Sequence, residues 1–292
     1  MPELEEIQVD EKTKKVFKRK GYNIDKPLGA GSFGKVYLAT KEGEKCFFAV
    51  KVMDLSRVST KFKEKFLPRE LAALIEVKHP NIIETFDIFR SNQRIYIFME
   101  YISGGDIAGY IKKNGPLNEV KACKWFAQVC DALNYLHNTK YMAHRDIKVD
   151  NIMLNEEMTD AKLTDFGFVK ESWDQNKQEV ILSDTFCGTE PYYSPEILRK
   201  VKYDPYKADV WAMGITLFAM TNNKYPFHFA KVKQHLKEID DPDHLKGRFI
   251  KKFSRHYKEL LKKMLERNEP ERIGIKDVCD HKWIKERGNC SH

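Results

Sequence analysis

The sequence has few cysteines, and no long apolar run. Its six cysteines are spread over 292 residues without a Cys-x-x-Cys pair, which excludes a disulfide scaffold and zinc-finger spacing and leads us to expect reduced thiols. No apolar run reaches the roughly 18 residues of a membrane span. The acidic residues 1–6 lack the apolar core of a secretory signal. We therefore expect a cytoplasmic protein without a membrane partner, with the nucleus as the alternative location.

A clustered basic surface is also lacking. The net charge of +8 comes from 51 Lys and Arg against 43 Asp and Glu, but the lysines are dispersed. A nucleic-acid-binding protein would need a basic face with interleaved aromatic residues, and the short basic run at residues 14–20 does not supply one. We expect a well-solvated, lysine-rich surface and no nucleic-acid partner.

The hydrophobic patterning predicts an α+β fold in two lobes. Up to residue 101, short β-rich runs surround one helical stretch, whereas helical periodicity dominates after residue 105. The expected strands are 22–29, 34–40, 46–53, 83–89 and 94–101, and the expected helices are 62–77, 118–138, 206–221, 253–266 and 275–280. The expected domains are a charged lead-in at 1–21, a small lobe at 22–101, a larger helical lobe at 102–284 and a short tail at 285–292.

A glycine-rich loop separates the first two expected strands. It reads Gly29-Ala30-Gly31-Ser32-Phe33-Gly34 and is followed by the strand-like residues 35–39, whereas in a dinucleotide-binding fold the third glycine opens a helix. Glycine lets backbone N–H groups approach phosphates closely. An ordinary hairpin turn is the alternative for this motif taken alone.

Lys51 lies inside the apolar run 48–52. A buried lysine is costly unless it is paired. Phosphate oxygens and Glu70, on the following expected helix, are its candidate partners. The alternative is a lysine on an edge strand whose charged end reaches solvent.

The segment 144–151 contains Asp146, Lys148 and Asn151, and Asp165 follows in an Asp-Phe-Gly sequence. A carboxylate such as Asp146 accepts the proton of an attacking hydroxyl, while Asn151 and Asp165 supply the hard oxygen ligands that suit Mg²⁺ beside the phosphates of ATP. Six features occur in the order typical of one class of phosphoryl-transfer enzyme. They are the glycine loop, the lysine, the glutamate, these two motifs and the Ser-Pro-Glu at 194–196.

Residues 22–284 therefore resemble a eukaryotic protein kinase. Lys148, and Thr189 before the Ser-Pro-Glu block, match serine/threonine kinases rather than tyrosine kinases. The segments 64–70, 182–188 and 203–211 resemble the testis-specific serine kinases of the calmodulin-dependent-kinase group. The resemblance implies transfer of the γ-phosphate of ATP, with Mg²⁺, to serine or threonine hydroxyls of protein substrates.

The resemblance implies further roles for individual residues. The adenine pocket would contain Leu28, Val36, Ala49 and Met153, with Met99 as gatekeeper, Glu100 to Ile102 as the hinge and Asp106 at the ribose. An internal hydrophobic column would contain Leu74, His144 and Phe166. Asp209 would anchor the catalytic-loop backbone, and Glu196 would pair with Arg272.

Regulation is expected at the activation segment. Arg145 is a guanidinium that requires an anion, and the resemblance makes Thr185 the first candidate phosphosite and Ser183 the second. The alternative is that Thr185 only caps or packs the loop. An upstream activating kinase or a chaperone would be a further partner. Cys187 is either redox-sensitive or, as we expect, a small packed thiol.

The resemblance predicts the substrate preference of this chain less well than it predicts the reaction. Asp106 and Asp150 would favour a basic residue N-terminal to the target hydroxyl, but Glu190, Tyr192 and Tyr193 depart from the small residues usual in relatives. The chain ends soon after residue 284, so we expect no autoinhibitory calmodulin-binding tail. A pseudokinase is the remaining alternative, although the residues that carry the chemistry are all present.

Overall fold

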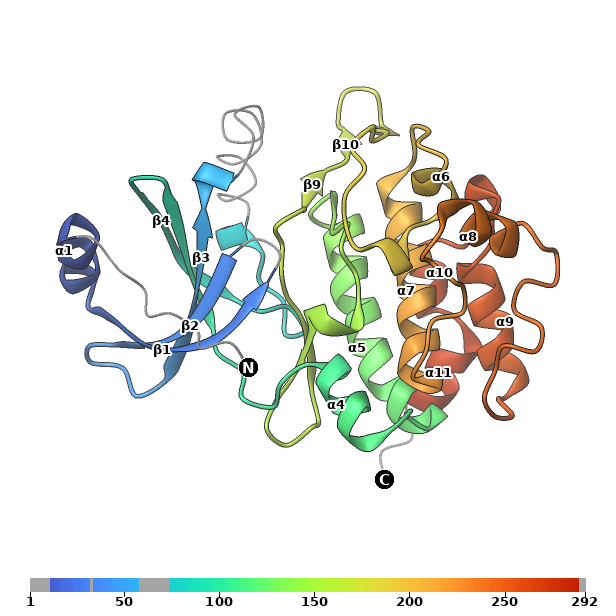
Figure 1. Ribbon diagram of the computed structural model, residues 1–292, viewed down its shortest axis with the longest axis horizontal. Coiled ribbons are helices and arrows are strands. Elements are labelled where there is room, and N and C mark those ends of the chain that lie inside the picture. Colours follow the sequence, from blue (N-terminus) through green and yellow to red (C-terminus); the bar gives the residue numbers. More distant parts are fainter. Residues whose placement is uncertain (1–10, 32–33, 58–73, 289–292) are drawn as a thin grey trace. The chain divides into compact units, whose positions relative to one another are not determined.

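The structure is a computed structural model that describes residues 11–31, 34–57 and 74–288. The chain divides into two compact units, with the boundary between Ile102 and Ser103 (Figure 1). This boundary directly follows the hinge expected at Glu100 to Ile102 and lies one residue from the expected lobe boundary.

The first unit contains a five-stranded antiparallel sheet, as predicted. Strand ends differ from the prediction by a few residues at most, and Pro27 lies at an irregularity of the first strand, where a missing N–H costs least. The spatial order is β1-β2-β3-β5-β4. The strands are β1 (Tyr22–Gly31), β2 (Gly34–Lys41), β3 (Phe47–Asp54), β4 (Thr85–Ser91) and β5 (Arg94–Glu100), with a 3₁₀ turn at Leu55–Arg57.

The register of the sheet separates two faces. Val36 is opposite Lys51, and Ala49 is opposite Met99. Residues directly opposite one another, and residues two apart on one strand, share a face. These four side chains therefore lie on one face. The other face carries a buried aromatic and aliphatic cluster of Tyr37, Phe48, Val50, Val52, Tyr96 and Phe98.

Helix α1 (Glu11–Lys20) covers part of this aromatic cluster. The Phe17 side chain is 5% exposed and its ring centroid lies 5.0 Å from that of Tyr96 and 5.1 Å from that of Phe89. The Thr13 hydroxyl donates to the Ser91 hydroxyl at 2.8 Å. The charged lead-in expected at residues 1–21 therefore contains a packed helix over residues 11–20, which was not predicted because lysines surround the one large apolar residue and hide the helical pattern.

The predicted helix at 62–77 lies outside the described residues except at its end, where residues 74–76 are helical. Nothing of the structure tests the rest of that prediction.

The second unit is mainly helical, and the four helices predicted in it are confirmed. They are α5 (Glu119–Asn138), α7 (Pro205–Asn222), α9 (Arg255–Met264) and α10 (Ile275–Cys279). Asn118 caps α5 by accepting a hydrogen bond from the Lys121 N–H at 2.9 Å, and Asp204 caps α7. Helix α7 is buried over nearly its whole length and contacts both α5 and α9 (Figure 1).

Several short elements were not predicted, because they offer too few turns for a periodic pattern. These are helices α4 (Ile107–Asn114), α6 (Pro195–Leu198), α8 (Val232–Ile239) and α11 (Lys282–Gly288), the 3₁₀ turns at Val149–Asn151, Glu190–Tyr192 and Glu269–Glu271, and three small two-stranded antiparallel sheets. The sheets pair β6 (Met142–Ala143) with β9 (Lys170–Glu171), β7 (Ile152–Leu154) with β8 (Ala161–Leu163), and β10 (Trp173–Asp174) with β11 (Glu179–Val180).

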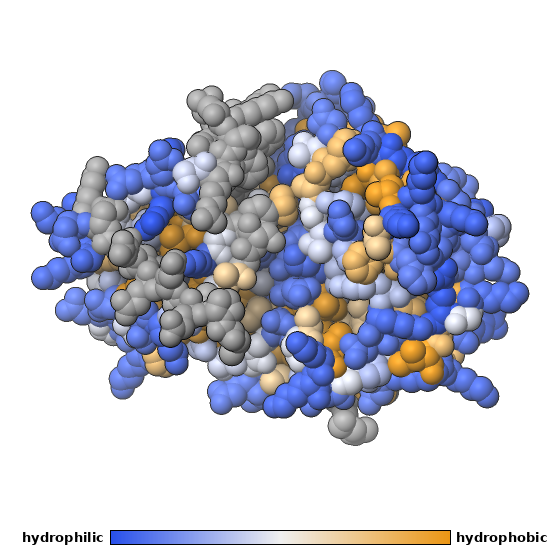
Figure 2. Space-filling view, viewed as in Figure 1, coloured by the Kyte–Doolittle hydropathy of each residue, from blue (hydrophilic) through white to orange (hydrophobic). Residues whose placement is uncertain are grey.

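Hydrophilic residues dominate the face shown in Figure 2, which fits the expected solvated surface. Within the described ranges, no helix combines the length and the hydropathy that a membrane span requires.

We predict that Phe17→Ala lowers the free energy of unfolding by about 3 kcal/mol, because a large buried ring is removed from a packed cluster. Chemical denaturation followed by fluorescence measures the change. Lys15→Ala, at an exposed position of the same helix, is the control and should stay close to wild type. Equal stability of the two variants would show that α1 does not contribute to the fold.

Candidate active site

Lys51 lies at the centre of the first unit's sheet. Strand β3 has β2 on one side and β5 on the other, and Lys51 is 7% exposed. The alternative of an edge-strand lysine is therefore wrong. The register places Lys51 on the same face as the predicted adenine-pocket residues Val36, Ala49 and Met99. Its predicted partner, Glu70, lies outside the described residues.

The glycine loop joins β1 and β2 as a hairpin. Gly29 is opposite Val36 and Gly31 is opposite Gly34, while Ser32 and Phe33 lie outside the described residues. A Cβ atom added to Gly34 would lie 1.9 Å from the carbonyl oxygen of Val52. The third glycine is thus required for close packing of β2 on β3, independently of any nucleotide.

The remaining predicted nucleotide-contact residues of this unit lie at its margins. Leu28 is 38% exposed on β1. Met99 and Glu100 end β5, and the Glu100 N–H donates to the Glu84 carbonyl at 2.9 Å. Ile102 is the last residue of the unit.

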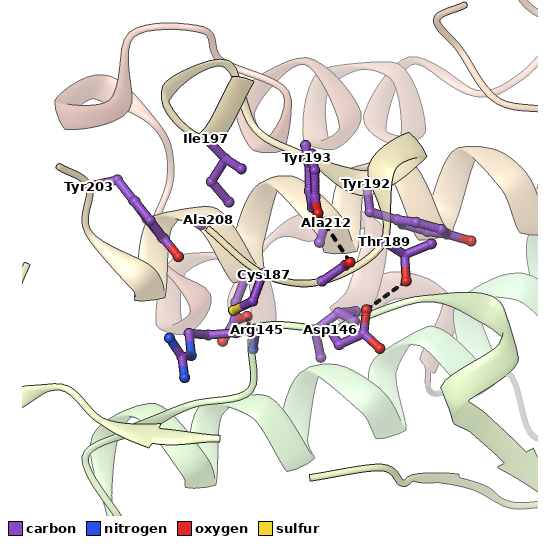
Figure 3. Close-up of a pocket in the computed structure, with 13 residues that line it drawn as sticks. Arg145, Asp146, Cys187, Thr189, Tyr192, Tyr193, Ile197, Tyr203, Ala208 and Ala212 are labelled. Carbon is purple, nitrogen blue, oxygen red and sulfur yellow. Dashed lines mark hydrogen bonds between the residues drawn. The ribbon is translucent and has the colours of Figure 1, made fainter. Parts of the chain in front are cut away.

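In the second unit, the Asp146 carboxylate is buried among polar partners. Its Oδ1 accepts a hydrogen bond from the Thr189 hydroxyl at 2.8 Å, which Figure 3 shows. Its Oδ2 lies 2.9 Å from Lys148 Nζ and accepts a hydrogen bond from Asn151 Nδ2 at 3.0 Å. Lys148 also donates to the Thr189 hydroxyl at 2.8 Å. The structure thus brings together the three loop residues named from the sequence, and adds Thr189, whose contact across the chain the sequence did not reveal.

Asp209, on α7, holds the backbone of this loop, as the resemblance implied. Its Oδ1 accepts from the Arg145 N–H and its Oδ2 from the His144 N–H, each at 2.7 Å. The side chain of Asp209 is 1% exposed, and His137 Nε2, on α5, lies 2.9 Å from Oδ2. The role of His137 was missed, because only folding brings it close to a residue 72 positions away.

His144 is a neutral connector inside the site. Burial lowers the pKa of its imidazole. Its Nδ1 accepts from the Asp146 N–H at 3.3 Å, so Nε2 carries the proton and donates to the Thr164 carbonyl at 3.0 Å. The imidazole ring also contacts the Phe166 ring, with centroids 5.1 Å apart. His144 therefore links the catalytic loop to the Asp-Phe-Gly segment through a hydrogen bond and a ring contact.

Two residues of the site have left-handed backbone conformations that non-glycine residues rarely adopt. Arg145 has φ 65° and Asp165 has φ 61°. Such conformations cost about 1–3 kcal/mol each and persist where surrounding contacts enforce them. The two hydrogen bonds around Arg145, from its N–H to Asp209 and from its Nε to the Phe168 carbonyl at 2.6 Å, are contacts of this kind.

Asn151 and Asp165 present oxygen atoms suited to a hard cation. The Asn151 amide nitrogen donates to Asp146, to its carbonyl at 2.8 Å and to its carboxylate, which leaves the amide oxygen as the atom for a ligand. The Asn151 carbonyl accepts from the Thr164 N–H at 3.0 Å, next to Asp165. Oxygen donors of this chemistry fit Mg²⁺.

Asp106 and Met153 lie side by side in the second unit, joined by a β-bridge. The Asp106 carboxylate caps α4 by accepting from the Gly109 N–H at 2.7 Å. Each keeps a partly exposed side chain, and both belong to the predicted nucleotide-contact set.

The activation segment pairs with the chain before α7. Ser183 and Tyr203 form a β-bridge, and the Tyr203 hydroxyl donates to the Thr185 carbonyl at 2.8 Å. Thr185 is exposed, whereas Ser183 is fully buried, so Ser183 is the poorer phosphosite. Arg145, Cys187 and Tyr203 line one pocket (Figure 3).

Glu196 and Arg272 form the predicted ion pair, and it is buried and bidentate. Nη1 and Nη2 of Arg272 lie 2.7 and 3.1 Å from the two carboxylate oxygens of Glu196. Arg272 also donates to the carbonyls of Lys207 and Glu266, so all three of its side-chain nitrogens form hydrogen bonds. The pair fixes the end of the activation segment against the helical core.

The fold and the arrangement of these residues are those of the protein kinases. The family model described as "Protein kinase domain" matches residues 22–284, and the chain belongs to this family.

The most similar proteins that were found are serine/threonine-protein kinases. The chain is 35% identical over 271 residues to mouse testis-specific serine/threonine-protein kinase 2, covering 92% of this chain and 75% of that protein. It is 35% identical to human testis-specific serine/threonine-protein kinase 1, covering 94% and 75%. It is also 35% identical to Arabidopsis thaliana CBL-interacting serine/threonine-protein kinase 12, covering 90% and 52%.

The chain is thus a serine/threonine protein kinase, and the resemblance to the testis-specific kinases is confirmed. Membership of the family implies use of ATP and a divalent metal, and protein substrates.

Proposed function

We propose that this kinase uses Asp146 to accept the proton of the substrate hydroxyl and Lys148 to stabilise the charge on the transferred γ-phosphate. The observation that carries the proposal is the Thr189 hydroxyl. It donates to Asp146 and accepts from Lys148, each at 2.8 Å. A serine or threonine hydroxyl of a substrate would make the same two contacts.

In the proposed reaction, a bond forms between the substrate oxygen and the γ-phosphorus, and the bond from that phosphorus to the oxygen of ADP breaks. The hydroxyl proton moves to the Asp146 carboxylate. Lys148, as a fixed cation, lowers the energy of the charge that spreads over the phosphoryl oxygens. Asn151 orients Asp146 through its amide nitrogen.

The proposed nucleotide contacts are those that the resemblance implies, residue by residue. Lys51 would contact the phosphates, with Glu70 as its partner, and the glycine loop from Gly29 to Gly34 would lie over them. The shared face of Val36, Ala49, Met99 and Lys51 supports a flat apolar contact surface for adenine. The remaining proposed contacts are Leu28, Glu100, Ile102, Asp106 and Met153.

The metal would be Mg²⁺, held by Asn151 and Asp165. When bound, this ion neutralises phosphate charge and orients the γ-phosphate. The oxygen donors of both side chains, with no sulfur or imidazole ligand between them, support Mg²⁺ over softer metals.

We predict that Asp146→Asn abolishes transfer of γ-phosphate to a generic basic protein, with a loss of about 10³-fold or more, because the proton acceptor is removed. Radiolabel transfer in the presence of Mg²⁺ measures it, and chelation of the metal should stop the wild-type reaction. Lys51→Met should also be inactive. Asp131→Asn, at an exposed position of α5, is the matched control and should retain wild-type turnover.

Wild-type protein that transfers no phosphate under these conditions would favour the pseudokinase alternative. Undiminished transfer by a folded Asp146→Asn variant would contradict the proposed role of Asp146.

We further propose that phosphorylation of Thr185 switches the kinase on, by an upstream kinase or by the chain itself, with a chaperone as a further partner. Thr185 is exposed and therefore accessible. Nη1 of Arg145 is buried without a hydrogen-bond partner in the described part of the chain, so it retains a donor for an anion.

We predict that Thr185→Ala lowers turnover at least about tenfold, equivalent to ~1.4 kcal/mol, because charge-assisted hydrogen bonds to the phosphate are lost. Turnover of the purified variant is compared with wild type whose phosphosites are mapped by mass spectrometry. Thr159→Ala, in an exposed turn of the second unit, is the control. Unchanged turnover of Thr185→Ala would leave Thr185 as a packing residue only.

We also propose a preference for a basic residue N-terminal to the target hydroxyl. Asp150 is exposed beside the catalytic loop, and Asp106 is partly exposed at the start of α4. The carboxylates would attract a lysine or arginine of the substrate.

A positional peptide array measures this preference. We expect selection of basic residues by the wild-type chain and weaker selection by Asp150→Asn. A wild-type profile without basic selection would refute the preference and leave the phosphoryl-transfer chemistry untouched.

A further inference from the structure

Glu190 carries an exposed carboxylate that the fold does not use. It is the first residue of the 3₁₀ turn Glu190–Tyr192 in the second unit. Within the part of the chain that the structure describes, its carboxylate forms no hydrogen bond and no ion pair. Glu196, six residues later, differs, because both of its buried oxygens bind Arg272. Both carboxylate oxygens of Glu190 therefore remain available to a ligand.

The turn that carries Glu190 is attached to the catalytic loop. The hydroxyl of Thr189, the preceding residue, donates to Asp146 at 2.8 Å (Figure 3). The Tyr192 N–H donates to the Thr189 carbonyl at 2.9 Å, and the Tyr192 side chain is 5% exposed. Pro191 restricts the backbone between them. The backbone of Glu190 thus keeps a constant position relative to Asp146.

This position lies next to the place of the reacting hydroxyl. In the proposed function, a substrate hydroxyl makes the same contacts with Asp146 and Lys148 as the Thr189 hydroxyl does. Consecutive Cα atoms are about 3.8 Å apart, and an extended substrate advances about 3.3 Å per residue. A residue that directly flanks the target therefore comes within reach of the long Glu190 side chain.

We propose that Glu190 selects an arginine directly next to the target serine or threonine, by forming an ion pair with it. Two available carboxylate oxygens match the planar fork of a guanidinium better than a single ammonium group. The pair would be exposed to solvent, so it adjusts substrate preference and leaves the reaction itself unchanged. This inference rests on the proposed function, which supplies the place of the substrate hydroxyl.

The test uses serine peptides that carry either arginine or citrulline next to the serine, on one side or the other. Citrulline has nearly the same size as arginine but no charge. Initial rates with Mg²⁺ and ATP give kcat and KM, and fluorescence anisotropy gives the Kd of each peptide. We expect wild type to prefer arginine at one flank by about threefold to fivefold in kcat/KM, through KM. Added salt should weaken this preference.

Three variants separate the role of Glu190 from general electrostatics. Glu190→Gln should lose the preference, and Glu190→Lys should instead favour a glutamate at the same flank. Glu156→Gln is the matched control, because it removes the same charge at an exposed position of the same unit, and it should keep the preference. All three should melt at the wild-type temperature, since neither carboxylate has a partner among the described residues.

The proposal is overturned if wild type shows no preference for arginine at either flank, or if Glu190→Gln keeps it in full. An equal loss in Glu156→Gln would also overturn it, because net charge would then explain the preference. Transfer of phosphate to the citrulline peptides tests the proposed function separately. If no peptide is phosphorylated, the proposed function fails, and the ratio of the Kd values still decides whether Glu190 binds arginine.

Discussion

The buried carboxylate of Asp209 is the contact on which the catalytic loop depends. It accepts 2.7 Å hydrogen bonds from two successive backbone N–H groups, those of His144 and Arg145. A buried charge without such donors would be costly, and a carboxylate that accepts them is strongly stabilised. Arg145 has a left-handed backbone, so the same two bonds also hold a strained conformation. Asp146 is the next residue, and its position follows from this anchor.

The sequence predicted the catalytic residues better than the side-chain contacts that position them. Asp146, Lys148 and Asn151 lie within six residues, so their proximity could be read from the chain. Thr189 is 43 residues from Asp146, and no local pattern shows that their side chains meet. His137 was missed for the same reason.

The fold was predicted where periodicity is strong. The alternation of apolar and polar residues in β2 and β3 predicted these two strands. The observed register then shows which face of the sheet carries Lys51. Helix α1 was missed because Phe17 stands almost alone among lysines, and its burial depends on aromatic residues that come more than 70 positions later. The glycine at position 34 was assigned to phosphate approach, whereas its contact with Val52 gives an additional reason, one of backbone packing.

The most direct test of the account is the rate of phosphoryl transfer in a single turnover by Asp209→Asn, measured with the affinity for ATP. Asparagine keeps the size of the side chain but replaces one acceptor oxygen with a donor that faces a backbone N–H. The account predicts that transfer slows by about 100-fold, because Asp146 is displaced, while the Kd for ATP stays within about threefold of wild type. A folded variant that transfers phosphate at the wild-type rate would contradict it.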